Sequence, residues 1–131
     1  MRPVFAVGPE RPYGVLIAES PGGEEVAQGE PLVGPTGREL NRVLLDAGLV
    51  RERLLLINAV ACKPVEPKTE ADMRRAVVAC QPLFWAQLVR VAAETPTLVC
   101  GKWAHFAAFG VEKGVMKRRG FVNKKSALRP P

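Results

Sequence analysis

Two kinds of segment alternate along this chain. Short apolar runs at residues 14–18, 53–60 and 97–100 have the length and composition of strands that are buried on both faces. Between them, apolar residues recur three and four positions apart and predict helices from Thr36 to about residue 47, from Thr69 to about Cys80, over 83–93 and over 102–109. This order predicts a three-layer α/β/α fold with a mainly parallel central sheet, to which residues 120–122 could add a fourth strand.

Residues typical of helix ends support these limits. Thr36 and Glu39 have the spacing of a capping box, and Gly48 fits the position after the helix. Thr69 is expected to be the N-cap of the next helix, with acidic residues in its first turn. Pro82 should kink that helix or begin a new one. The proline-rich residues 1–13 are expected to be irregular.

Length and hydropathy limit the class of protein. The 131 residues predict a single domain, 1–131. No apolar run approaches the roughly 18 residues that cross a membrane, and the N-terminus has no apolar stretch typical of a signal peptide. We therefore expect a cytoplasmic protein without a membrane partner, and the sequence gives no indication of an oligomer.

The positive charge of the chain is concentrated at its C-terminus. The net charge is +6, yet segment 113–131 contains seven bases and no acid, so residues 1–112 carry a net charge of −1. Such a basic segment suits a nucleic-acid backbone, although a solvated tail has the same composition. The candidate contacts to a DNA backbone are Lys117, Arg118, Arg119, Lys124 and Lys125.

Two polar residues lie where parallel sheets bind ligands, beyond the carboxyl ends of the strands. Glu19 follows the first predicted strand, and Asn58 lies near the end of the second. The Asn amide presents a donor beside an acceptor, which matches the edge of a pyrimidine. Taken alone, each residue also fits a local role, as a surface salt bridge or a turn. The loop after Glu19 could bind a phosphate, but it has neither GxGxxG nor GxxxxGK[ST].

The cysteines and the single histidine give weaker signals. Cys62, Cys80 and Cys100 cannot all pair, and in a reducing compartment they are expected to be free thiols or metal ligands. Cys100 and Trp85 are interpreted as core residues. His105 lies among apolar helix residues and is expected to be packed rather than catalytic.

Four stretches in order resemble the iron–sulfur uracil-DNA glycosylases of family 4. AESPGGEEVAQGEPLVGPTGRELNRVL resembles that family's G-E-A-P-G-x-x-E-D and G-x-P-F-V-G-x-A-G-x-x-L motifs. INAVACKPVEPKTEADMRRAVVACQP resembles its T-N-x-V-K-C-R-P-P stretch and a later cysteine before proline. LVCGKWAHFAAFG and VMKRRGFV resemble the strand, helix and R-G segment that follow. The resemblance extends from about Val15 to Val122.

The resemblance implies a hydrolase of base excision repair that flips uracil out of DNA and cleaves its N-glycosidic bond. Glu19 would act near the attacking water, and Asn58 would read the uracil edge. Cys62 and Cys80 would be ligands of a possible [4Fe–4S] cluster. The implied base pocket consists of Ser20, Pro21, Gly22, Pro31, Leu32, Val33 and Gly34, of which Ser20 and Gly22 can also approach the DNA backbone.

The sequence departs from the family pattern at three points. Leu32 replaces an aromatic residue that stacks on the base, Cys62 and Cys80 match only two of four cluster cysteines, and no His follows the R-G segment. An alternative is therefore a catalytically silent nucleic-acid or nucleotide-binding module on the same fold. An unrelated α/β nucleotide-binding protein with a similar glycine-rich loop is a further alternative.

Overall fold

At the centre of the described part of the chain lies a parallel sheet of three strands. The computed structural model describes residues 2–66 and 68–110. Strands β1 (Gly14–Ala18), β2 (Leu54–Asn58) and β3 (Thr97–Val99) lie in the order β2-β1-β3. Both pairings are parallel, with Ala18 opposite Asn58 and Val15 opposite Thr97. The first strand of the chain is thus the middle strand of the sheet.

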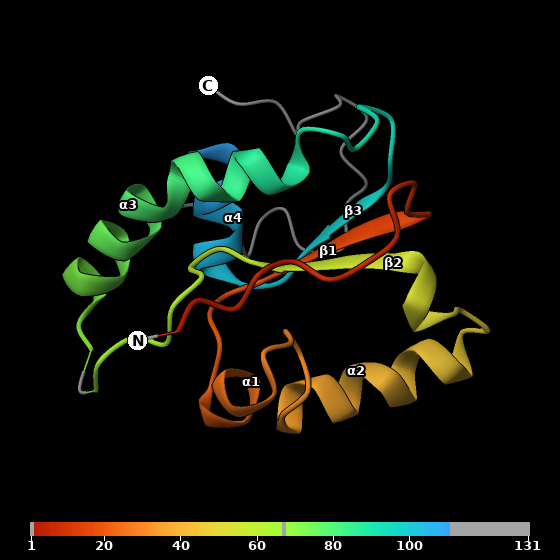
Figure 1. Cartoon of the computed structure of the whole chain (residues 1–131), viewed down its shortest axis with the longest axis horizontal. Helices are drawn as coiled ribbons and strands as arrows, with labels where there is room; N and C mark the ends of the chain where they lie inside the picture. The colour runs from red at the N-terminus through yellow and green to blue at the C-terminus, as the bar shows by residue number, and fades with distance from the viewer. Residues whose placement is uncertain (1, 67, 111–131) are drawn as a thin grey trace.

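Helices cover both faces of the sheet. Helices α1 (Gly23–Gln28) and α2 (Pro35–Asp46) lie on one face, and α3 (Glu70–Leu88) and α4 (Lys102–Phe109) lie on the other (Figure 1). A 3-10 turn at Arg51–Arg53 leads into β2. The predicted three-layer α/β/α fold with a parallel sheet is confirmed.

The residues of β1 supply two separate hydrophobic clusters. Val15 and Ile17 pack with residues of α3 and α4, including Phe84 and Trp103. Leu16 and its neighbour Ala18 pack on the other side of the sheet, in a smaller cluster with Leu32 and Leu56. Because successive side chains of a strand point to opposite faces, covering both faces requires an unbroken apolar run. The sequence VLIA in β1 meets this requirement.

The N-terminal segment adds a contact that its composition does not predict. Val7 and Leu56 exchange two backbone hydrogen bonds, of 3.0 and 2.9 Å, as an antiparallel bridge on the outer side of β2. The Val4 N–H also donates to the Ala61 carbonyl at 2.7 Å. Residues 2–13 contain no strand or helix, as expected, but they protect the edge of the sheet from pairing with other chains.

The predicted start of α3 is confirmed, and that of α2 is wrong. The Thr69 hydroxyl accepts the Asp72 N–H at 3.1 Å, and the Asp72 carboxylate accepts the Thr69 N–H at 3.0 Å. Helix α2 instead begins at Pro35, whose fixed φ suits the first helical position, and Gly34 is its N-cap. Glu39 does not reach back to Thr36 and pairs with an exposed arginine of the next turn, Arg42.

Other limits also differ from the prediction. Helix α3 runs through Pro82 as one element, so a new helix does not begin there, and it ends at Leu88 rather than near 93. Pro82 has no N–H to donate to the carbonyl of Val78. Because Val78 is 56% exposed, water can donate to that carbonyl instead. The short helix α1 lies in a segment that was expected to be a glycine-rich loop.

The single-residue predictions for the core have mixed outcomes. His105 is 5% exposed and its ring lies 4.9 Å from that of Phe109, so its packed position is confirmed. Trp85 packs edge-on against Phe84 at the border of the larger cluster, as expected. Cys100 is exposed, so its interpretation as a core residue is wrong; it follows a three-residue edge strand that offers little cover.

Two predictions fall outside the residues described. The possible strand 120–122 and the basic segment 113–131 lie beyond residue 110. Within residues 2–66 and 68–110, no helix combines the length and apolar character that crossing a membrane requires.

Candidate functional site

The carboxyl ends of β1 and β2 bring the two main candidate residues to one edge of the sheet. Asn58 is the last residue of β2 and lies opposite Ala18, the last residue of β1. Glu19 follows directly, and its carbonyl accepts the Val60 N–H at 2.9 Å. The topology therefore places Glu19 and Asn58 at adjacent strand ends, as the sequence predicted.

Asn58 is buried and incompletely hydrogen-bonded. Asn58 is 5% exposed, and its Nδ2 has no hydrogen-bond partner among the residues that the structure describes. Two-residue alternation places its side chain on the same face as Leu56, which is the face covered by α1 and α2. Leaving a buried amide donor without an acceptor costs about 1–3 kcal/mol. Such a group is typical of a site whose acceptor is supplied by a ligand or by water.

Glu19 is more accessible than Asn58 and has a cationic neighbour. It lies in the bend after β1, and its side chain is 41% exposed. Its Oε1 lies 3.3 Å from the Nζ of Lys68, which immediately precedes the N-cap of α3. The carboxylate is thus open to solvent at the strand end and is partly neutralised by this ammonium group.

The second segment that was predicted to line the base pocket, Pro31–Gly34, packs closely on the sheet and on α2. Pro31 is fully buried, and its carbonyl accepts from the Arg51 guanidinium at 3.0 Å. Leu32 has a φ of 55°, a left-handed conformation that costs a residue with a Cβ roughly 1–2 kcal/mol. Its side chain is buried in the cluster with Leu16 and Leu56.

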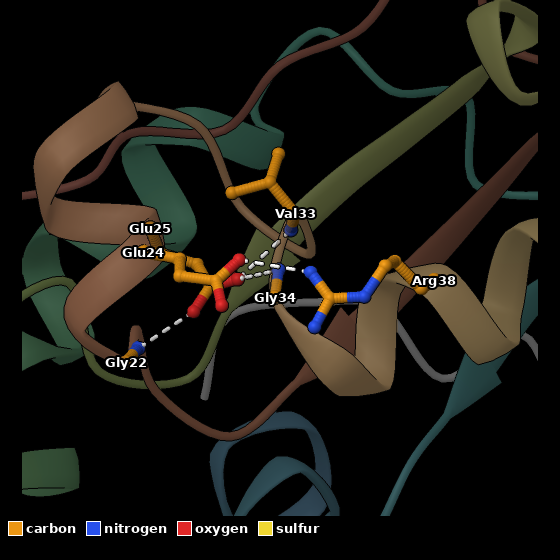
Figure 2. A network of polar contacts seen from close by, with 6 residues as sticks. All are labelled: Gly22, Glu24, Glu25, Val33, Gly34 and Arg38. Atoms are coloured by element: carbon orange, nitrogen blue, oxygen red, sulfur yellow. Dashed lines mark hydrogen bonds and ion pairs between the residues drawn. The ribbon is translucent and has the colours of Figure 1, made fainter.

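A buried carboxylate joins this segment to the loop after β1. Glu25, on α1, is 9% exposed and accepts three backbone N–H groups. The donors are Gly22 at 3.0 Å, Val33 at 2.8 Å and Gly34 at 2.5 Å (Figure 2). The carboxylate therefore bonds to both of the segments that were predicted to line the base pocket.

Burial and hydrogen bonding act on the pKa of Glu25 in opposite directions. Burial raises the pKa of the Glu25 carboxyl, but the backbone N–H groups of Gly34, Val33 and Gly22 together outweigh burial, so the pKa is lowered. The charged form is thus the one that the fold stabilises.

Glycine lets the backbone approach this carboxylate closely. A Cβ on Gly22 would lie 2.9 Å from the Glu25 Oε1, and a Cβ on Gly34 would lie 3.0 Å from its Oε2. A Cβ on Gly37 would lie 1.8 Å from the carbonyl oxygen of Leu32, so the first turn of α2 also needs glycine. These glycines provide close backbone approach rather than flexibility.

An exposed ion pair reinforces the same junction. Glu24 on α1 lies 2.9 Å from the Arg38 guanidinium on α2, and both side chains are about half exposed or more (Figure 2). An exposed pair of this kind contributes about 0–1 kcal/mol, so Glu25 is expected to make the larger contribution.

Glu25 is the residue that the sequence-based interpretation missed. The signal was present as two acidic residues after Gly22-Gly23, which is typical of the first turn of a helix. Glu25 also occupies the N3 position, where a carboxylate reaches back to the backbone of the N-cap.

The cysteines by themselves do not form a complete metal site. Cys62 lies between β2 and α3, and Cys80 lies on α3 against the larger cluster. Within the described ranges, no group of three or more His, Cys, Asp or Glu side chains could hold a metal. A [4Fe–4S] cluster normally takes four thiolates, so the donors in these ranges do not fit it. The candidate DNA contacts Lys117 to Lys125 lie outside the described residues.

Comparison with known proteins gives one family over most of the chain. The model of the uracil DNA glycosylase superfamily matches residues 5–126. A type-4 uracil-DNA glycosylase of Thermotoga maritima is 29% identical over 106 residues, which cover 81% of this chain and 54% of the relative.

Two archaeal relatives show the same pattern. A type-4 uracil-DNA glycosylase of Archaeoglobus fulgidus is 40% identical over 61 residues, 47% of this chain and 31% of the relative. One from Saccharolobus solfataricus is 29% identical over 104 residues, 79% of this chain and 46% of the relative. The chain thus spans about half or less of the length of these curated relatives.

We expect Glu25→Gln to destabilise the protein by about 1.5–3 kcal/mol, because the neutral amide is a poorer acceptor and turns an N–H₂ group toward backbone donors. Urea unfolding at pH 7 measures the change. Glu24→Gln is the matched control and should cost about 1 kcal/mol or less, since its ion pair is exposed. Equal losses for the two variants would contradict the role given to the buried carboxylate.

The stabilisation by Glu25 should depend on pH in a defined direction. Its pKa in the folded protein is lowered from 4.5, so its contribution is complete above about pH 4.5 and is lost as the pH falls through the folded pKa. The difference in unfolding free energy between wild type and Glu25→Gln should therefore be constant near neutrality and shrink toward pH 3. A difference that grows with acidity would show that the protonated acid is the stabilised form.

Proposed function

The chain belongs to the uracil DNA glycosylase superfamily, and on this premise we propose that it hydrolyses the N-glycosidic bond of uracil in DNA. The observation that best supports the proposal is the buried Asn58 amide, whose Nδ2 lacks a partner among the described residues, on the strand next to Glu19. The relatives named type-4 uracil-DNA glycosylase support the same substrate.

Asn58 would select the base. A free Nδ2 donor, buried and held by β2, favours a ring that presents a carbonyl acceptor, and the amide oxygen can accept the neighbouring ring N–H. Cytosine presents an amino group where uracil has its carbonyl oxygen, so two donors would face each other. A buried donor left unpaired in this way penalises the wrong base strongly.

Glu19 would act at the sugar. The bond between the base nitrogen and C1′ breaks, its electron pair leaves with the base, and water supplies the oxygen that C1′ gains. A carboxylate beside C1′ can orient that water, accept its proton and stabilise positive charge that develops on the sugar. The exposure of Glu19 at the strand end suits a group that must meet both water and DNA.

Glu25 would act indirectly, as a positioning residue. Its three backbone hydrogen bonds fix Gly22 relative to Val33 and Gly34, and these residues belong to the two segments proposed to enclose the flipped base. Because catalysis by positioning is sensitive to displacements of about 1 Å, this link would matter without any contact to the base.

A second candidate function is nucleic-acid binding without hydrolysis. Leu32 supports it, because its side chain packs on the sheet and provides no aromatic ring for the base. Base–aromatic stacking is worth roughly 1–3 kcal/mol, so a pocket without it would hold uracil more weakly. Binding of a uracil-containing oligonucleotide with no abasic product would favour this candidate.

We expect Glu19→Gln to lower the rate of uracil release by about 10²–10⁴-fold, because the amide can neither accept a proton nor stabilise positive charge. Alkaline cleavage of labelled single- and double-stranded oligonucleotides at the abasic site measures the rate. Glu10→Gln is the control, since Glu10 is also an exposed glutamate 3.3 Å from a cation, Arg90. A Glu19→Gln rate equal to that of wild type would reject the catalytic assignment.

Asn58→Leu should lose activity without losing stability. Removing a positioned donor of this kind lowers rates by about 10²–10³-fold. Because Nδ2 is unpartnered among the described residues, an apolar side chain of similar size should leave the unfolding free energy unchanged or raise it. The excision assay and urea unfolding together give the result. A large loss of stability would indicate that the amide is structural instead.

A further inference from the structure

The loop between β2 and α3 places two lysines beside the segment that follows Glu19. Lys63 and Lys68 both lie on this loop, and both residues are exposed. Parallel pairing of β1 with β2 makes the segments after the two strands neighbours at the carboxyl edge of the sheet. The loop therefore faces the turn from Glu19 to Gly23.

Lys68 lies at the start of this turn, beside Glu19. Its Nζ lies 3.3 Å from the Glu19 carboxylate, and its side chain is 30% exposed. A surface pocket of about 330 Å³ opens beside it, lined by Pro64, Val65, Lys68, Asp72, Met73 and Ala76. The Lys68 ammonium can thus be reached from outside while it contacts Glu19.

Lys63 lies at the other end of the turn, near Gly23. Its Nζ lies 3.9 Å from the point that a Cβ on Gly23 would occupy, so the ammonium reaches the start of α1. Among residues 2–66 and 68–110, it makes no ion pair. Its positive charge is therefore not neutralised by a described carboxylate.

We propose that Lys63 and Lys68 bind the two DNA phosphates that flank the flipped nucleotide, one at each end of the Glu19–Gly23 turn. This inference rests on the proposed function for the choice of DNA as the polyanion. On that proposal, a base bound at Asn58 has its sugar near Glu19, and the phosphates on either side of that sugar then pass close to this turn.

Electrostatics gives the reason for two cations at this place. The Glu19 carboxylate repels a phosphate backbone, and the ammonium group of Lys68, which is paired with Glu19, offsets that repulsion. The exposed ion pair is worth about 0–1 kcal/mol, so a phosphate can share or take the ammonium at little cost. Glu24, the exposed acid on α1, is already paired with Arg38.

The salt dependence of DNA binding tests the proposal. Binding of a fluorescently labelled single-stranded oligonucleotide with one uracil is measured by anisotropy between 50 and 200 mM salt, for wild type, Lys63→Gln, Lys68→Gln and the double variant. Each lost phosphate contact should make the plot of log association constant against log salt concentration shallower by roughly 0.7. Between 50 and 200 mM salt, the affinity of such a variant should therefore fall about 2.6-fold less than that of wild type. In the double variant the slope should decrease by about twice as much as in either single variant.

Two controls isolate the phosphate contact. Arg90→Gln also removes one positive charge from an exposed ion pair, because Arg90 lies 3.3 Å from Glu10, the same distance as between Lys68 and Glu19. Glu10 lies between Val7 and β1, away from the Glu19–Gly23 turn in the sequence. The salt dependence of DNA binding by this variant should equal that of wild type. Lys63→Arg with Lys68→Arg keeps both charges and should restore the slope. A double Gln variant with an unchanged slope, or an equal drop for Arg90→Gln, would overturn the proposal.

The outcome is separable from that of the proposed function. The uracil excision assay is run on the same wild-type preparation. A reduced slope in the double variant without any excision by wild type would support the phosphate contacts and reject the hydrolase. Excision by wild type together with an unchanged slope would reject the contacts and leave the hydrolase in place.

Discussion

The hydrogen bonds of the buried Glu25 carboxylate are the interaction on which the geometry of the site depends. A charged group with 9% exposure must be compensated, and here the donors are three backbone amides rather than a cationic side chain. The restraint therefore acts directly on the main chain of two segments, around Gly22 and around Gly34. This explains how a glycine-rich stretch can have a defined shape, since each of these glycines leaves room for a carboxylate oxygen.

The sheet complements this restraint with rigidity. Register between β1 and β2 fixes Asn58 opposite Ala18, one residue before Glu19, without any help from the loops. The buried amide and the left-handed Leu32 each cost stability, and both lie on the α1–α2 side of the sheet. The larger cluster on the other face, built around Phe84 and Trp103, supplies hydrophobic stabilisation that offsets these costs.

Features set by local pattern were predictable from the sequence, and those set by distant contacts were not. The continuous apolar run of β1 and the capping box at Thr69 depend on neighbouring residues, so both could be predicted correctly. Helix α1 was missed because its six residues bury only Glu25 and so have no apolar stripe. The start of α2 was placed at Thr36, whereas the chain is held at Gly34 by a carboxylate nine residues earlier in the sequence. The contact of Lys68 with Glu19 spans 49 positions and has no local signal at all.

The central place of β1 has a consequence for synthesis on the ribosome. The segment VLIA is made before both of its partners, so one of its hydrogen-bonding edges stays open until residues 54–58 are made and the other until residues 97–99 are made. Pairings between such distant segments form slowly, and an apolar strand with open edges can associate with other nascent chains. Of the three described strands, the one translated first is thus the last to have both of its edges paired, and its second edge is closed only when β3 has been made.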